Sequence, residues 1–185
     1  MINTIPAVLE HRKVATQILL VIGASIFIAL AAQIAVPIPL TPVPLTLSPL
    51  AVLIVGIVLG SRRGSAAAVL YLLEGLSGLP VGAQGHGGPL WLIGPTAGYL
   101  YAYPFAAFIA GWFSERGWGG TIPRAFIAML VALSVIYAGG WSWLAILSGP
   151  RAALSMAIVP FVIADLVKIA IGAAMLPYAQ RAIRA

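Results

Sequence analysis

The segment IVPFVIADLVKIAIGAAML, residues 158–176, decides how the rest of the chain must be arranged. It is long and apolar enough to cross a membrane, yet Asp165 and Lys168 lie in its middle. A charged side chain at the bilayer centre costs about 2.5 to 3.5 kcal/mol on insertion scales. Residues three positions apart share one face of a helix, so these two charges can partly neutralise each other. That face cannot contact lipid, and we expect it to point into a cavity that other helices enclose.

The composition of the whole chain indicates a membrane environment. Of 185 residues, 62% are hydrophobic and 8% are charged, and the mean hydropathy is +1.07. A soluble domain carries about 25% charged residues, so the sequence predicts an integral membrane protein. The length suits one domain, residues 1–185. The absence of cysteine excludes disulfides, thiolate metal sites and thiol nucleophiles.

The basic residues indicate topology rather than nucleic-acid binding, although the net charge is +6. If the N-terminus is cytoplasmic, Lys168 lies in the membrane and Arg151 lies outside, and the other eight of the ten Lys and Arg residues lie inside. We therefore expect an all-α bundle of six transmembrane helices with both termini cytoplasmic. The predicted helices are residues 14–36, 48–60, 65–77, 95–113, 122–138 and 153–182.

Three unusual loops would then share the external face. They are a proline-rich segment (36–49), a glycine-rich loop (78–98) and a tryptophan-bearing loop (139–151). Glycine-rich backbone at membrane depth is tolerated only where it lines a cavity or is buried in protein. The N-termini of the second, fourth and sixth helices would also face outward, where their free amides favour an anionic group such as a carboxylate. We expect an external ligand pocket lined by Asp165, Lys168 and the glycine-rich loop.

Three segments together resemble the BioY family, the biotin-binding S components of energy-coupling factor (ECF) transporters. GLPVGAQGHGGPLWLIGPTAGYL, residues 78–100, resembles the family signature. IPLTPVPLTLSPLAVLIVGIVLG, residues 38–60, matches a second block of the family. PFVIADLVKIAIGA, residues 160–173, resembles the last helix with its Asp-x-x-Lys spacing. The resemblance covers nearly the whole chain after residue 13.

The resemblance implies a function as well as a fold. Members of this family have six transmembrane helices and bind biotin in an external pocket. They import it with an EcfT-type transmembrane scaffold and two ABC ATPase subunits, in the cell membrane of bacteria or archaea. The chain would have no cofactor of its own, and only the partner subunits would use ATP.

The predicted ligand site combines this resemblance with the chemistry of the side chains. In it, the Asp165 carboxylate accepts from the two N–H groups of the ureido ring, and Lys168 balances the carboxylate and donates to a ligand oxygen. Tyr99 is suited both to ligand contact and to anchoring at the membrane interface. The predicted substrate-binding residues are Asp165, Lys168, Tyr99, Gln84, Gly94 and Thr96.

Several other residues have more than one interpretation. His86 is expected to be solvated, whereas Glu74 could cap a helix, pair with Arg151 or face the pocket. Trp91, Trp141 and Trp143 are expected in the aromatic belt at the outer interface, with a pocket lid as the alternative.

Small residues on the first helix suggest a surface where another helix could approach closely. They are spaced four apart, and the alternative to a partner surface is packing within the bundle. The residues predicted to face the scaffold subunit are Ala31, Ala35, Ser25 and Ala29.

Two other classes of protein compete with a transport subunit. An enzyme is disfavoured because the only histidines, His11 and His86, lie in terminal or loop positions, and no catalytic or P-loop motif is present. An autonomous ion-coupled carrier could use the Asp165–Lys168 pair, but the sequence shows no evident inverted repeat. We therefore rank the vitamin-binding subunit first and the autonomous carrier second.

Overall fold

The chain folds into a mostly helical structure. The computed structural model describes the backbone of residues 4–39 and 41–184, and the side chains of residues 14–39 and 41–176. In chain order, the elements are α1 (Thr4–Gln33), β1 (Ala35–Val36), β2 (Leu45–Thr46), α2 (Ser48–Leu59), α3 (Ser61–Leu76), η1 (Ala83–Gly85), η2 (Pro89–Leu92), α4 (Ala97–Glu115), η3 (Trp118–Gly120), α5 (Ile122–Ser148), α6 (Pro150–Ala157) and α7 (Val162–Arg184).

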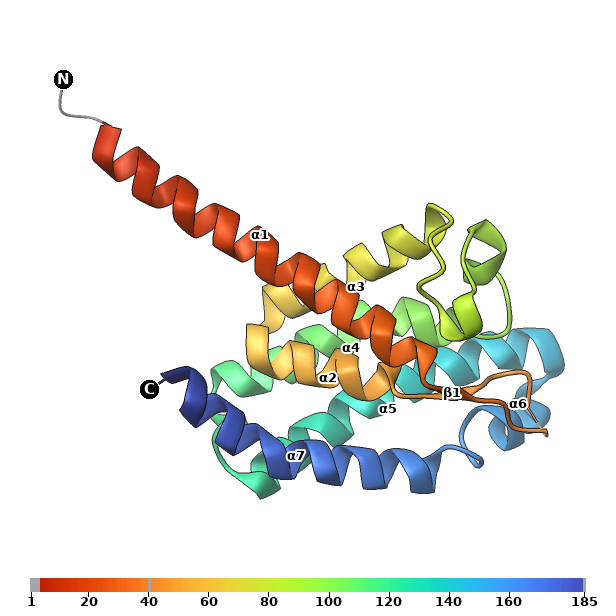
Figure 1. The fold of residues 1–185 in the computed structure, drawn as a ribbon. Helices are drawn as coiled ribbons and strands as arrows, with labels where there is room; N and C mark the ends of the chain where they lie inside the picture. The colour runs from red at the N-terminus through yellow and green to blue at the C-terminus, as the bar shows by residue number, and fades with distance from the viewer. Residues whose placement is uncertain (1–3, 40, 185) are drawn as a thin grey trace.

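Most of the irregular segments gather at one end of the bundle, whereas the connection with η3 lies at the other (Figure 1). The antiparallel β1–β2 pair, the glycine-rich loop and α6 lie at this end, while the start of α1 and the end of α7 lie at the other (Figure 1). The first half of α1 extends away from the other helices. The fold thus places the proline-rich and glycine-rich segments together, as their composition predicted.

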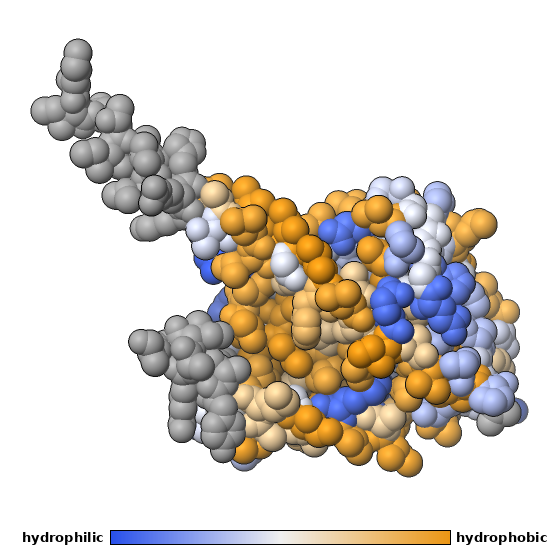
Figure 2. All heavy atoms as spheres, in the orientation of Figure 1, coloured by the Kyte–Doolittle hydropathy of each residue, from blue (hydrophilic) through white to orange (hydrophobic). Residues whose placement is uncertain are grey.

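The lengths of the helices fit a membrane protein. Residues Val14–Gln33 of α1 and Ile122–Ser148 of α5 are each long and apolar enough to cross a membrane, and α6 with α7 can form a third span bent by 45°. Figure 2 shows hydrophobic atoms over the middle of the molecule and hydrophilic atoms mostly towards the end with the loops. Apolar side chains exposed in this way need lipid or protein to cover them.

Two helix predictions need correction. The stretch 153–182, expected as one helix, is two helices, because Pro160 has no amide to continue the hydrogen bonding and its ring opposes a straight helix. The prediction for 122–138 ended too early, since α5 continues to Ser148 through the expected loop. The first helix, α1, begins at Thr4 rather than at residue 14. The other bounds of the first four helices lie within a few residues of the predicted ones.

The longer α5 is explained by how closely it packs on α4. A Cβ atom at Gly98 would overlap the backbone carbonyl of Gly139, and a Cβ at Gly139 would overlap that of Gly98. These glycines therefore mark a helix crossing rather than a loop, because only residues without side chains let two backbones come this close. The crossing holds the first turns of α4 beside the second half of α5.

The small residues predicted as a partner surface pack mainly against other parts of this chain, and their contact with the scaffold subunit stays a prediction. Ser25 is fully buried and its hydroxyl donates to Glu74 of α3, and Ala31 is also buried. Ala29 is partly buried against the core, and Ala35 lies beyond the helix in β1. The Ser25 bond also shows where Glu74 points, since its carboxylate faces α1.

Candidate ligand-binding site

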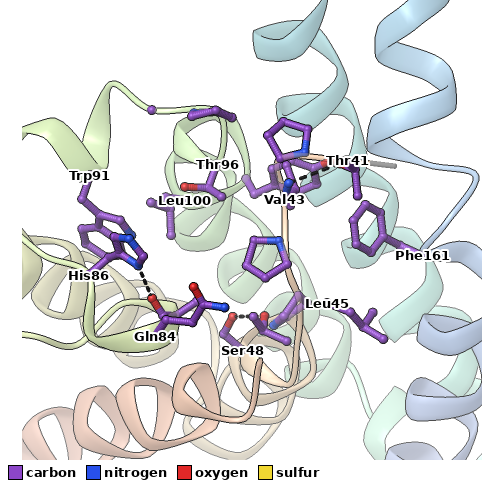
Figure 3. Close-up of a pocket in the computed structure, with 18 of the residues that line it drawn as sticks. Thr41, Val43, Leu45, Ser48, Gln84, His86, Trp91, Thr96, Leu100 and Phe161 are labelled. Atoms are coloured by element: carbon purple, nitrogen blue, oxygen red, sulfur yellow. Dashed lines mark hydrogen bonds between the residues drawn. The ribbon is translucent and has the colours of Figure 1, made fainter. Parts of the chain in front are cut away.

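A cavity of about 550 Å³ lies at the end of the bundle that carries the loops. Its walls come from the proline-rich segment, the glycine-rich loop and helices α2 to α5 and α7. Figure 3 shows Thr41 and Phe161 on one side of it and Gln84, His86 and Trp91 on the opposite side. Ligand pockets in proteins span about 300 to 1,000 Å³ and are mostly apolar with a few polar groups, which describes this cavity.

A charged group of the cavity wall is the Asp165 carboxylate at the start of α7, which is 5% exposed. Its Oδ1 accepts a hydrogen bond from Lys168 Nζ at 2.8 Å, and its Oδ2 accepts one from the Tyr137 hydroxyl of α5 at 2.7 Å. Each carboxylate oxygen can accept about two hydrogen bonds, so both retain capacity for a ligand donor. The carboxylate is thus held in place without being fully occupied.

Lys168 lies behind Asp165, outside the set of described residues that line the cavity. Besides its ion pair, its ammonium donates to the backbone carbonyl of Thr46 at 2.7 Å. It therefore ties β2 to α7 while neutralising the carboxylate. A third hydrogen on the ammonium remains, but the geometry favours a supporting role over the direct ligand contact that was expected.

A chain of hydroxyl groups runs along another wall. Thr46 Oγ1 and Ser48 Oγ are 2.7 Å apart, and Ser48 Oγ and the Tyr103 hydroxyl are 2.8 Å apart. Ser48 opens α2, where Pro49 occupies the first turn, since a proline there loses no helical hydrogen bond. The chain links the proline-rich segment to α4.

The Tyr99 side chain enters the wall from the first turn of α4. Its hydroxyl donates to the carbonyl of Ala157 at 2.8 Å, and its ring lies against Gly140, where a Cβ atom would overlap it. Because the hydroxyls of Tyr99 and Tyr137 both donate to protein oxygens, each can offer only an acceptor to a ligand. Together with Asp165, they make this part of the site rich in acceptors.

The glycine-rich loop is fixed by one glutamine and one tryptophan. Gln33 Nε2, at the end of α1, lies 3.0 Å from the Gly82 carbonyl, to which it donates, and 3.3 Å from those of Pro80 and Val81. Trp91 is 9% exposed and packs edge-on against Tyr71, with ring centroids 5.5 Å apart. The expectation that Trp91 belongs to the outer aromatic belt is therefore wrong, because it forms part of the cavity wall.

The structure brings five of the six predicted substrate-binding residues to this cavity: Gln84, Gly94, Thr96, Tyr99 and Asp165. Gln84 adopts a left-handed conformation with φ of 57° at the tip of the loop and is exposed. His86 is also exposed, as expected, although it lines the cavity and its Nδ1 lies 2.6 Å from the Ala83 carbonyl.

The sequence interpretation missed several cavity residues. Tyr103 follows Tyr99 at a spacing of four, which places both on one helix face, so the pair could have been recognised. Tyr137, Ser48 and Phe161 carry no such local signal, because they reach the cavity from separate elements.

The fold and the cavity define a helical membrane protein with a candidate site of the size and polarity of a small-molecule pocket. A family model matches residues 5–185, and the chain belongs to the BioY family. The "Probable biotin transporter BioY" of Pyrococcus horikoshii is 40% identical over 152 residues, covering 79% of this chain and 86% of that protein. The "Biotin transporter BioY" of Thermotoga maritima is 39% identical over 157 residues, covering 82% and 90% respectively.

A solved structure shares the fold. The crystal structure of the S-component for biotin from an ECF-type ABC transporter superposes with a TM-score of 0.83 and covers 92% of this chain and 93% of its own. The sequences of the two proteins are 22% identical, so the likeness concerns the architecture.

Proposed function

We propose that this chain is the biotin-binding S component of an ECF-type transporter and takes part in biotin uptake as a transport subunit rather than an enzyme. The observation that carries the proposal is the buried Asp165 carboxylate beside tyrosine hydroxyls in the wall of a mostly apolar cavity, in a chain of the BioY family. Biotin combines an apolar bicycle with two ureido N–H donors, which is the chemistry such a cavity can accommodate.

In the proposed binding mode, the ureido N–H groups donate to Asp165, with Tyr137 and Tyr99 offering further acceptors. Lys168 balances the charge of Asp165, and the third hydrogen of its ammonium group would be available for a ligand oxygen. The bicycle packs on aromatic walls that include Phe161 and Trp91.

The acidic tail of biotin would point towards the glycine-rich loop. Gln84 supplies an amide donor there, and Gly94 and Thr96 precede the N-terminus of α4, where the helix dipole favours a carboxylate. In this binding mode, all six predicted substrate-binding residues would lie in or directly behind one site.

The proposed topology has six spans in a single domain, residues 1–185. The spans are α1, α2, α3, α4, α5 and the bent pair α6–α7, in a multi-pass arrangement in the bacterial or archaeal cell membrane. Both termini would be cytoplasmic and the cavity external. The exposed arginines at the starts of α3 and α5 and the end of α4 support this orientation, because they lie opposite the loops that form the cavity.

The proposed partners are an EcfT-type transmembrane scaffold and ABC ATPase subunits. The sequence has no P-loop, so energy from ATP would have to come from other chains. The second candidate, an autonomous ion-coupled carrier, is kept because Asp165 and Lys168 form an intramembrane ion pair, a group that such carriers use.

The direct test is to purify the protein from biotin-containing medium and identify the bound small molecule by mass spectrometry, with biotin titrated calorimetrically into ligand-free protein. We expect biotin to co-purify in a one-to-one ratio. Recovery of a different molecule, with no heat on adding biotin, would refute the proposal.

Uptake and topology need separate measurements. Proteoliposomes containing this chain alone should not accumulate biotin in response to an ion gradient, whereas an autonomous carrier would.

A cysteine replacing Gln84 in this cysteine-free chain should be labelled from outside intact cells, and one replacing Arg63 only after the cells are permeabilised.

A further inference from the structure

The break between α6 and α7 leaves two backbone carbonyls without their usual helical partners. In a continuous helix, the carbonyl of Met156 would accept from the amide of residue 160, but Pro160 has no N–H. The carbonyl of Ala157 would accept from Phe161, whose amide instead donates to the carbonyl of Ile158 at 3.0 Å. Buried carbonyl groups need donors from elsewhere in the fold.

Both carbonyls receive side-chain hydroxyls from the walls of the cavity. Thr41, in the proline-rich segment, donates to the Met156 carbonyl at 2.9 Å. Tyr99, in α4, donates to the Ala157 carbonyl at 2.8 Å. Two walls that are distant in the sequence are therefore attached to adjacent residues at the end of α6.

The proline-rich segment depends strongly on its Thr41 contact. The same hydroxyl accepts from the amide of Val43 at 3.2 Å, so it also holds the turn that follows. The surrounding prolines, including Pro42 and Pro44, have no amides with which to form other backbone bonds. Loss of the Thr41 hydroxyl therefore removes a large share of the polar contacts that keep this wall in place.

We infer that Pro160 is a positioning residue of the ligand site. By breaking the last span at the depth of the cavity, it frees the two carbonyls that hold Tyr99 in the wall and the proline-rich segment against α6. The Thr41–Met156 hydrogen bond then holds this wall in place, and its loss increases the solvent access of residues in the cavity wall. The inference concerns the same cavity as the proposed function, but its test requires no ligand.

The test measures solvent access to one cysteine. Leu100, which is buried and lines the cavity, is replaced by cysteine, and the rate of labelling by a small water-soluble methanethiosulfonate is measured in lipid nanodiscs. Added to this background, Thr41→Val should accelerate labelling by about three- to tenfold, the range that one hydrogen bond can produce. Thr41→Ser retains the hydroxyl and should label at the background rate. Thr121→Val, at the opposite end of the bundle, is the matched control and should also leave the rate unchanged.

Pro160→Ala tests whether Pro160 is the reason that the Met156 carbonyl is free to accept from Thr41. The restored amide can bond the Met156 carbonyl within the helix and displace Thr41, so labelling should accelerate to a similar extent. The double variant Thr41→Val with Pro160→Ala should label no faster than the faster of the two single variants, because both substitutions remove the same hydrogen bond. Pro160→Gly also restores the amide, and it replaces Pro160→Ala in the same test if the alanine variant does not fold.

The inference would be overturned if Thr41→Val labelled at the background rate. It would also be overturned if the acceleration in the double variant were the product of the two single accelerations. Neither result depends on biotin. A protein that labels as expected but binds no biotin would instead refute the proposed function alone.

Discussion

The Tyr137 hydroxyl donates a hydrogen bond to Asp165 Oδ2 at 2.7 Å, joining the middle of α5 to the start of α7 at the wall of the cavity. The two residues are 28 positions apart, and neither helix alone could form this arrangement. With Lys168 on the other oxygen, the contact fixes the orientation of the carboxylate before a ligand arrives. Such preorganisation lowers the entropy lost on binding.

Asp165→Asn should weaken biotin binding about tenfold or more. The amide replaces one acceptor oxygen by a donor, which then faces Tyr137, Lys168 or a ligand N–H, each of which also donates. An unsatisfied buried donor costs about 1 to 3 kcal/mol, and about 1.4 kcal/mol corresponds to a tenfold change in affinity. Calorimetry on detergent-solubilised protein measures the change. Unaltered affinity in a folded variant would remove Asp165 from the site.

Tyr137→Phe should also reduce biotin affinity, by about tenfold, because hydrogen bonds to charged groups contribute about 1.5 to 3 kcal/mol. Tyr101→Phe is the matched control, since its hydroxyl donates to the Leu92 carbonyl and the residue lies on the exposed side of α4. The same titration applied to both variants separates the site tyrosine from the control. Equal losses would mean that the effect is general rather than local.

Lys168→Met should weaken binding and lower the melting temperature. It leaves Asp165 without its counter-charge and the Thr46 carbonyl without its donor, and breaking a buried ion pair on one side costs about 3 to 5 kcal/mol. Combining it with Asp165→Asn removes both charges, so the double variant should recover most of the melting temperature without recovering affinity. If the double variant binds biotin as the parent does, the pair is purely structural.

Gly140→Ala should reduce affinity by about tenfold while the fold persists, because the added methyl group occupies the place of the Tyr99 ring and pushes it away from Ala157. Gly23→Ala, on the exposed face of α1, is the control, since no atom lies within 4 Å of the added Cβ. An alanine in a helix is about 0.5 to 1 kcal/mol more favourable than a glycine, so the control should be as stable as the parent or more so. Comparing affinities and melting temperatures tests both expectations, and normal binding by Gly140→Ala would contradict the role of Tyr99.

Glu115 makes the stability of the charged end of the bundle depend on pH. Its Oε1 accepts from the Ser61 amide at 2.7 Å and hydroxyl at 2.8 Å, and these bonds hold the pKa of Glu115 below its ordinary value of 4.5. A lowered pKa stabilises the folded state above the ordinary value, and this stabilisation is lost as the pH falls below about 4.5 through the folded pKa. Because Glu115 is exposed, the effect should be modest.

The measurement for Glu115 is a series of melting curves between pH 7 and pH 3 for the parent and Glu115→Gln. The parent should be the more stable at pH 7, and the difference should shrink below pH 4.5. A difference that stays constant over this range would show that the carboxylate charge does not stabilise the start of α3.

The sequence by itself indicated a membrane environment, the helical class and the segments that form the candidate site. Asp165 and Lys168 in an apolar stretch require an inward face, whatever surrounds it. Glycines at 78–98 and prolines at 36–49 cannot form ordinary spans, so both segments had to lie at an end of the bundle. These conclusions needed only local chemistry and the properties of the bilayer.

Only the tertiary structure decided which partners each group meets. Gly139 was predicted to lie in a loop, but it packs against Gly98 of α4 within a helix. Ala31 was predicted to face the scaffold subunit only from its small size, and the structure shows that it packs in the core of the chain. Nothing near Tyr137 in the sequence indicates that its hydroxyl reaches Asp165. Helix crossings and hydrogen bonds between elements depend on how several helices pack at once, and this information is distributed over the chain rather than written in any one segment.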